Sequence, residues 1–236
     1  MRPDSPLVRA LAAIVLALAA APLAAAPIDL NGPGRTRQDR DRDAYNHPEA
    51  LFAFWGLHEG MRVMDLYPGD GYTTLLLSQL VGSGGRVLAY DSYDHEAFDK
   101  RMKPLALANV EETAAAEPEC FKTLPTTLAA LPAASLDAIV TIRNYHDIAE
   151  PARALAEMKR LLKPGGILGI VDSRTAAGRD EKTHRIADDV IIREAIAAGF
   201  TLAGVSQILS NPRDDATKGF WEERFIVDQS CLRFTK

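Results

Sequence analysis

The sequence predicts an α/β fold in which a doubly wound sheet carries helices on both faces. Three observations indicate this fold. Residues 61–91 form a complete strand–helix–strand pattern, and apolar strands at residues 136–142 and 167–171 flank a second helical pattern. Hydrophobic residues make up 47% of the 236-residue chain, which is enough for the core of one such domain.

The first unit alternates apolar segments with glycine turns. Met61–Leu66 is a short apolar run that predicts a strand, and Thr73–Val81 places leucines at helical spacing. Gly82–Gly85 ends this helix, because glycine adopts the left-handed conformation at little cost. Arg86–Tyr90 predicts a second strand, so the whole segment is a βαβ unit.

The turn after the first strand has the character of a nucleotide-type ligand site. Gly69 and Gly71 let the backbone approach a ligand closely, and the following helix N-terminus offers free N–H groups. Asp91, after the second strand, can accept hydrogen bonds from ribose hydroxyls. A dinucleotide fingerprint would need glycine at Thr74, which disfavours a nicotinamide or flavin dinucleotide. An ordinary tight turn is the alternative.

Residues 65–73, DLYPGDGYT, resemble motif I of the class I S-adenosylmethionine (SAM)-dependent methyltransferases, with Tyr67 in place of the first motif glycine. The resemblance implies a Rossmann-like doubly wound sheet of seven strands, mostly parallel with the last strand antiparallel. It also implies SAM as cofactor and S-adenosylhomocysteine as product, with the Gly69–Gly71 backbone at the methionine part and Asp91 at the ribose. The implied cofactor-binding residues are Asp65, Tyr67, Gly69, Gly71, Tyr72, Asp91 and Asn144.

The second half of the chain resembles the same fold. Leu136–Ile142 is a buried strand, Glu150–Leu162 is a helix that Lys163–Gly166 ends, and Ile167–Val171 is the next strand. The other expected elements are a helix opened by His47-Pro48, a strand near Ala108–Glu111, a helix over Ala187–Ala198, and strands over Phe200–Ser206 and Arg224–Phe234. Polar loops are expected over Ser173–Thr183 and Gln207–Gly219.

Polar residues that follow a buried strand are the candidate catalytic residues. Ligands lie over the carboxyl ends of strands in open α/β sheets, and Asn144–Asp147 follows such a strand. Methyl transfer to a hydroxyl or amine needs an oriented nucleophile and removal of a proton. His146 is the candidate general base, because its ordinary pKa is about 6.5. Asp147 or Asp172 could orient it, and Tyr145 could line the methyl channel. Alternatively, His146 caps the next helix or bonds a loop carbonyl.

His184 and Arg185 form a second polar pair near the same edge. They could contact the substrate, as could Asp172, or supply a base from a lid, and a simple helix start is the alternative. Cysteines and histidines lack the spacing of a zinc site, so no metal is predicted. The Gly-x-Ser-x-Gly motif is missing from the sequence, which disfavours an α/β-hydrolase.

Residues 1–26 predict a secretory signal peptide. Arg2 and Arg9 supply positive charge, Ala10–Ala21 is an apolar run, and Ala24–Ala26 offers a small-residue cleavage site. We therefore expect export, to a bacterial periplasm. An uncleaved membrane anchor is the alternative, disfavoured because the run is shorter than the roughly 20 residues of a membrane span.

Residues 27–43 precede the predicted domain at residues 44–236. They are polar and lack apolar periodicity, which predicts a flexible N-terminal arm, and a segment that folds over the active site is the alternative. The net charge of −5 argues against binding to nucleic acid or to an anionic membrane surface. Cys120 and Cys231 are expected as free thiols, with a disulfide between them as the alternative.

These features together predict an exported SAM-dependent methyltransferase for a small-molecule substrate, without stable membrane association after signal cleavage. The signal peptide and the segments PGDGY, NYHD and THRI make the chain similar to a group of exported bacterial proteins described as predicted SAM-dependent methyltransferases. The alternative is an exported, non-catalytic protein that binds a small-molecule or nucleotide-like ligand. The polar residues 144–147 favour the enzyme, because binding alone needs no base. A nicotinamide-dependent oxidoreductase is a weaker third possibility, which Thr74 opposes.

Overall fold

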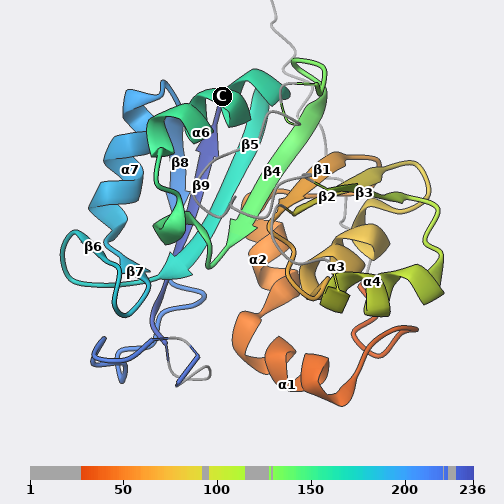
Figure 1. The fold of residues 1–236 in the computed structure, drawn as a ribbon, viewed down its shortest axis with the longest axis horizontal. Coiled ribbons are helices and arrows are strands. Elements are labelled where there is room, and N and C mark those ends of the chain that lie inside the picture. The colour runs from red at the N-terminus through yellow and green to blue at the C-terminus, as the bar shows by residue number, and fades with distance from the viewer. Residues whose placement is uncertain (1–27, 92–95, 115–127, 129, 220, 223–226) are drawn as a thin grey trace, which may run out of the picture.

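The computed structural model describes residues 28–91, 96–114, 128, 130–219, 221–222 and 227–236. Its centre is a seven-stranded sheet in the order β3-β2-β1-β4-β5-β9-β8 (Figure 1). The strands are β1 (Arg62–Leu66), β2 (Arg86–Asp91), β3 (Val110–Ala114), β4 (Leu136–Ile142), β5 (Leu162–Ser173), β8 (Thr201–Val205) and β9 (Gln229–Thr235). Strands β1 to β5 pair in parallel, and β9 is antiparallel to β5 and β8. The predicted mostly parallel, doubly wound sheet with an antiparallel last strand is confirmed.

Helices cover both faces of this sheet (Figure 1). Helices α2 and α3 pack on one face, and α6 and α7 pack on the other. The described α-helices are α1 (Arg37–Asn46), α2 (Pro48–Trp55), α3 (Tyr72–Val81), α4 (Glu96–Met102), α6 (Pro151–Leu161) and α7 (Asp188–Ala197). Successive strand residues face opposite layers, so Val63 contacts the α2–α3 layer and Met64 the α6–α7 layer.

Trp55 anchors α2 directly on the sheet. Its side chain is fully buried, and its Nε1 donates a hydrogen bond to the carbonyl of Leu232 at 3.0 Å. A Cβ at Gly169 would lie 2.5 Å from the indole ring. Glycine at this position therefore lets the ring pack on the backbone of β5.

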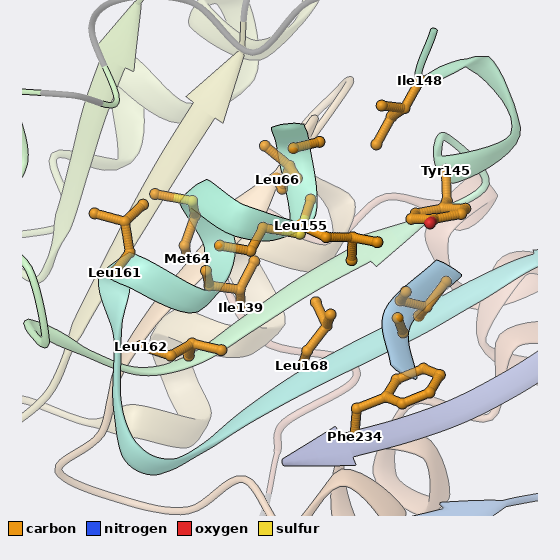
Figure 2. Packing of buried hydrophobic residues seen from close by; sticks show 14 of the residues in the cluster. Met64, Leu66, Ile139, Tyr145, Ile148, Leu155, Leu161, Leu162, Leu168 and Phe234 are labelled. Carbon is orange, nitrogen blue, oxygen red and sulfur yellow. The ribbon is translucent and has the colours of Figure 1, made fainter. Parts of the chain in front are cut away.

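The larger core cluster fills the space between the sheet and the α6–α7 layer (Figure 2). Met64, Leu168 and Phe234 from three strands belong to it with Leu155 from α6. Tyr145, just beyond β4, is part of the same cluster and is 0% exposed. Burying a large apolar side chain contributes about 1.5–3 kcal/mol. The segment that follows β4 is therefore fixed to the core through Tyr145.

Two further elements lie at the carboxyl ends of the parallel strands. These are α1 and a two-stranded hairpin of β6 (Arg179–Asp180) and β7 (Arg185–Ile186) (Figure 1). Helix α1 corrects the expectation of a flexible arm over residues 27–43. The hairpin likewise corrects the expected loop over residues 173–183. Polar contacts rather than apolar periodicity build both elements, which is why hydrophobic patterning did not predict them.

Other differences from the prediction are small. Strand β3 begins at Val110, two residues later than expected, and β9 begins at Gln229 rather than at residue 224. None of the described helices is long and apolar enough to cross a membrane. The predicted signal peptide and Cys120 lie outside the described residues, and Cys231 is a buried free thiol.

Candidate functional site

The turn between β1 and α3 has a left-handed backbone at three alternate positions. The angle φ is +63° at Tyr67, +56° at Gly69 and +78° at Gly71. This conformation costs a residue with a Cβ about 1–2 kcal/mol, whereas glycine adopts it readily. Tyr67 therefore has a backbone conformation that favours glycine. Its side chain is buried, and its N–H donates to the carbonyl of Tyr90 at 2.8 Å.

Asp65 and Thr74 link the end of β1 to the start of α3. The hydroxyl of Thr74 donates to Oδ2 of Asp65 at 2.6 Å, and both residues are buried. A glycine at position 74 would leave this buried carboxylate without that donor. The contact gives a physical reason for the departure from the dinucleotide fingerprint.

Charged side chains hold α1 over the glycine turn. Its first turn has a capping box, in which Thr36 Oγ1 accepts from the N–H of Asp39 and Asp39 Oδ2 accepts from the N–H of Thr36. Asp39 is buried and receives two hydrogen bonds from Arg101 of α4, at 2.6 and 3.1 Å. Arg42 donates to Asp70 in the glycine turn at 2.7 Å. Helix α1 is therefore tied to both α4 and the turn.

Tyr72 strengthens the same attachment. Its hydroxyl donates to Asp43 of α1 at 2.7 Å, and the guanidinium groups of Arg35 and Arg42 lie 5.0 and 5.3 Å from its ring centre. Burial and the neighbouring Asp43 raise the pKa of Tyr72. The phenol is therefore a neutral donor that holds α1 in place.

A cavity of about 250 Å³ lies between the glycine turn, α1 and the end of β4. A Cβ at Gly69 would meet nothing within 4 Å, whereas one at Gly71 would lie 2.9 Å from Met102. Gly69 therefore presents open backbone, and Gly71 is needed for packing. The cavity is lined by Arg42, Asp65, Tyr67, Pro68, Gly69, Asp70, Tyr72, Thr73, Ile142, Arg143 and Asn144.

Arg42 and Arg143 both line this cavity, and the positive charge of Arg143 is the less neutralised of the two. Its Nη1 donates to two neutral amide oxygens, Asn46 Oδ1 at 3.2 Å and Gln229 Oε1 at 2.9 Å. Within the described part of the chain it forms no ion pair, whereas Arg42 is paired with Asp70. The cavity thus contains a guanidinium that a ligand carboxylate could neutralise.

Asp172, at the end of β5, fixes His146 on the short helical turn η2 (Tyr145–Asp147). Asp172 Oδ2 accepts from the backbone N–H of His146 at 2.8 Å, and Oδ1 lies 2.7 Å from its Nδ1. Asp172 is 0% exposed and His146 is 5% exposed. A carboxylate only accepts, so Nδ1 carries the proton of this bond and Nε2 is the outward-facing nitrogen.

His146, Asp147 and His184 bring three polar atoms together. His146 Nε2 lies 3.1 Å from His184 Nδ1 and 3.2 Å from Asp147 Oδ2. His184 Nδ1 lies 3.1 Å from the same Asp147 oxygen. The side chains of Asp147 and His184 are 33% and 37% exposed, so the cluster opens to solvent on one side.

The β6–β7 hairpin positions His184. Asp180 Oδ1 accepts from the backbone N–H groups of Lys182 and Thr183, at 2.9 and 3.3 Å, which closes the turn. His184 then has a φ of +52°, an uncommon value for a residue with a Cβ. The ring of Trp221 contacts it edge-on, with 4.9 Å between ring centres. The turn therefore holds His184 in a strained conformation beside His146.

The surrounding carboxylates favour the protonated form of His146. Burial lowers the pKa of His146, but hydrogen bonds and charge from Asp147 and Asp172 outweigh burial and raise it to about 9. Burial likewise raises the pKa of Asp147, but His146 and His184 outweigh it and lower the value. With no cation bound between these residues, His146 is therefore an imidazolium at neutral pH, and it can accept a proton only after it has lost one.

Residues 64–170, from β1 into β5, match the methyltransferase domain family. The chain is 27% identical over 179 residues to the ubiquinone/menaquinone biosynthesis C-methyltransferase UbiE of Marinomonas sp., covering 71% of this chain and 67% of that protein. It is 30% identical over 198 residues to the arsenite methyltransferase of Aquipseudomonas alcaligenes, covering 78% and 53%.

Among solved structures, a SAM-dependent methyltransferase from Aquifex aeolicus has the same fold. The TM-score is 0.60 at 23% identity, and the match covers 84% of this chain and 96% of that one. Together, the domain match and these neighbours support the class I SAM-dependent methyltransferase superfamily. The chain spans about half the length of several curated relatives that it matches.

The structure does not place every predicted residue at the site. Tyr145 is buried, and its hydroxyl donates to Glu194 of α7 at 2.7 Å, so it does not line the cavity. Arg185 is 1% exposed and pairs with Asp214 at 2.7 and 3.1 Å, so it is a structural residue. Asp91 ends β2 as predicted, and its side chain lies outside the described part of the structure.

Sequence reasoning missed the residues that α1 contributes to the site. Arg42 lines the cavity, and Asp39 and Arg101 hold the helix that carries it. The buried face of α1 is ionic, so no apolar periodicity marks the helix. The available signal was the capping box, Thr36 followed three residues later by Asp39.

Proposed function

We propose that this protein is a SAM-dependent methyltransferase that transfers a methyl group to a small-molecule acceptor. The observation that carries the proposal is the left-handed backbone at positions 67, 69 and 71, which opens on a cavity beneath α1 at the carboxyl end of β1. The methyltransferase domain match supports the same activity. Nothing in the comparisons favours the non-catalytic binding alternative.

The residues around the cavity fit the methionine part of SAM. Open backbone at Gly69 allows close approach, and the guanidinium of Arg143 can bind the carboxylate. Asn144 uses its Nδ2 on two backbone carbonyls, so its Oδ1 is the atom that can accept from the ligand ammonium. Asp91, at the end of β2, is assigned to the ribose hydroxyls. When bound, SAM supplies an activated methyl group.

The cluster of His146, Asp147 and His184 is assigned to the acceptor. Its first residue, His146, is two positions after Asn144, which lines the cavity. His146 is held by Asp172, and when no cation is bound its raised pKa makes it a poor base by itself. Asp147 and His184, whose side chains are about one-third exposed, are the members that an acceptor can reach. We therefore propose that the three residues together orient the acceptor and take up the proton that it loses.

Export to the periplasm remains part of the proposal and rests on the sequence of residues 1–26. Cell fractionation followed by mass spectrometry tests it. We expect the periplasmic fraction to hold a chain that has lost about 26 residues. A full-length chain confined to the cytoplasm would contradict export without affecting the cofactor assignment.

Calorimetric titration of the full-length protein with SAM, S-adenosylhomocysteine and NAD tests the cofactor. We expect dissociation constants on the order of micromolar for the first two ligands and no binding of NAD. Gly69→Arg should abolish SAM binding, because its side chain enters the cavity. Gly60→Arg is the matched control, since Gly60 also has a positive φ and open space but does not line the cavity. Equal SAM affinity in both variants, or none in the folded wild type, would overturn the proposal.

A further inference from the structure

We propose that His146, Asp147 and His184 bind a divalent transition-metal ion. Within the described part of the chain, these residues offer three ligand atoms that all lie within 4.8 Å of one another. They come from two separate segments, the turn after β4 and the β6–β7 hairpin. The spacing of cysteines and histidines along the sequence predicted no metal, because His146 and His184 are 38 positions apart and meet only after folding.

The distances match those between ligands that share one ion. The three atoms form a nearly equilateral triangle with sides of 3.1, 3.2 and 3.1 Å. Nitrogen and oxygen ligands at about 2.1 Å from a metal are about 3.0 Å apart at right angles and about 3.4 Å apart at the tetrahedral angle. The triangle therefore already has the size of one face of a coordination polyhedron, with two imidazoles and one carboxylate.

Hydrogen bonds cannot satisfy this triangle. If His146 Nε2–H donates to His184 Nδ1, then His184 Nδ1 carries no proton. Its lone pair then faces the Asp147 carboxylate oxygen 3.1 Å away, which is repulsive. If both imidazole nitrogens instead donate to Asp147, their two protons face each other across 3.1 Å. With Asp147 ionised, every placement of the protons leaves one side of the triangle repulsive, whereas a single cation that replaces the proton on His146 Nε2 makes all three contacts favourable.

The buried carboxylate of Asp172 orients one of the two histidines of the proposed metal site. A metal-binding histidine usually donates its other ring N–H to a carboxylate or carbonyl, which fixes the tautomer and orients the ring. Asp172 does this for His146 at 2.7 Å and is itself held by the N–H groups of His146 and Ser173, each at 2.8 Å. His184 is oriented by the closed hairpin turn and by Trp221.

The donor set indicates both the metal and its use. Two imidazoles and one carboxylate suit zinc, iron(II) and neighbouring first-row ions better than calcium or magnesium, which prefer oxygen. Because Asp147 and His184 are about one-third exposed, an ion here keeps open positions for water or another oxygen ligand. This last step rests on the proposed methyl transfer: an acceptor that bears a hydroxyl or carboxylate could bind the metal directly.

Titration of tag-free, metal-stripped full-length protein with Co²⁺ tests the site, with visible ligand-field absorption as the readout. We expect one equivalent to bind, and Zn²⁺ to displace it. His184→Ala and Asp147→Asn should each weaken Co²⁺ binding by at least about tenfold. His58→Ala is the matched control, because it removes a histidine at a distant, partly exposed position and should change nothing.

Thermal unfolding of each variant shows whether it is folded. If His184→Ala does not fold, Asp147→Asn still tests the site. No binding of Co²⁺ or Zn²⁺ by the wild type, or equal affinity in the wild type and the folded variants, would overturn the proposal. SAM titration of the same samples separates the two proposals. SAM binding without metal binding would remove only the metal site, and metal binding without SAM binding would remove only the proposed function.

Discussion

Asp172 holds His146 at two points, through the backbone N–H at 2.8 Å and through Nδ1 at 2.7 Å. One side chain at the end of β5 thereby fixes the turn that follows the neighbouring strand β4. The contact is fully buried, so water cannot replace either hydrogen bond. It determines which nitrogen of His146 is directed at Asp147 and His184.

Asp172→Asn should destabilise the fold and misdirect His146. The amide can still accept one of these hydrogen bonds, but its NH₂ group faces a donor at the other. We expect the free energy of unfolding in urea to fall by about 1–3 kcal/mol. Asp189→Asn, on the exposed face of α7, is the control and should be neutral. Unchanged stability in Asp172→Asn would show that the two contacts are not formed as described.

Gly69 and Gly71 should respond differently to alanine. Both have positive φ, so each substitution costs about 1–2 kcal/mol from the backbone alone. The new methyl group at position 71 would also lie 2.9 Å from Met102, whereas position 69 is open. We therefore expect Gly71→Ala to lower the free energy of unfolding by about 1–3 kcal/mol more than Gly69→Ala. Equal losses in urea unfolding would contradict the described packing.

Arg143 should recognise the carboxylate of SAM rather than its adenosine part. Arg143→Gln should weaken SAM binding by about tenfold, the effect of about 1.4 kcal/mol. Decarboxylated SAM is the matched probe, because it lacks only the group that Arg143 is assigned to bind. Calorimetry should show that wild type and variant bind decarboxylated SAM equally. A loss of the same size for both ligands would point to a structural role for Arg143.

Asp39 should make the attachment of α1 sensitive to acid. Burial raises the pKa of Asp39, but hydrogen bonds from Thr36 and Arg101 outweigh it and hold the pKa below its usual range. A group with a lowered folded pKa stabilises the fold above its unfolded pKa of about 3.9, and this stabilisation is lost as pH falls through the folded value.

Urea unfolding of Asp39→Asn and wild type at two pH values measures this contribution. At neutral pH the variant should be less stable by about 1–3 kcal/mol, because Arg101 loses the shorter of its ion pairs and keeps the one with Asp70 at 3.5 Å. Below about pH 3.5 the difference should shrink, because the wild-type carboxylate is becoming protonated. A difference that does not change with pH would show that the charge of Asp39 is not what holds α1.

Tyr145→Phe should affect stability and leave cofactor binding unchanged. The substitution removes one buried hydrogen bond to Glu194, which contributes about 1 kcal/mol, and it keeps the ring in the core. Tyr145 does not line the cavity, so SAM affinity should not change. A large loss of SAM affinity would instead favour the role in the methyl channel that the sequence suggested.

Hydrophobic patterning predicted the sheet because its central strands β1, β4 and β5 are largely buried between two apolar layers. Val63 and Met64 illustrate this, since adjacent residues face opposite clusters. The glycine turn could be recognised for a similar reason: left-handed backbone at Gly69 and Gly71 restricts which residues fit. Tyr67 shows the limit of this rule, because packing stabilises a tyrosine in a conformation that favours glycine.

Polar elements of the site could not be predicted in the same way. Helix α1 is held by Asp39, Arg42 and their partners on other elements, so its own sequence shows no apolar face. The contact of His146 with His184 joins residues 38 positions apart, which meet only because β5 and the hairpin are folded. Residue types alone also could not separate Tyr145, which points into the core, from its neighbour His146, which points into the site.

A crystal structure of the full-length protein with S-adenosylhomocysteine tests the cofactor site most directly. We expect the ligand in the cavity beneath α1, with its amino-acid part against Gly69 and Asn144 and its carboxylate on Arg143. The ligand's ribose should lie at the end of β2. Well-ordered ligand bound elsewhere, or a cavity that stays empty at saturating concentration, would contradict the assignment of this crevice to SAM.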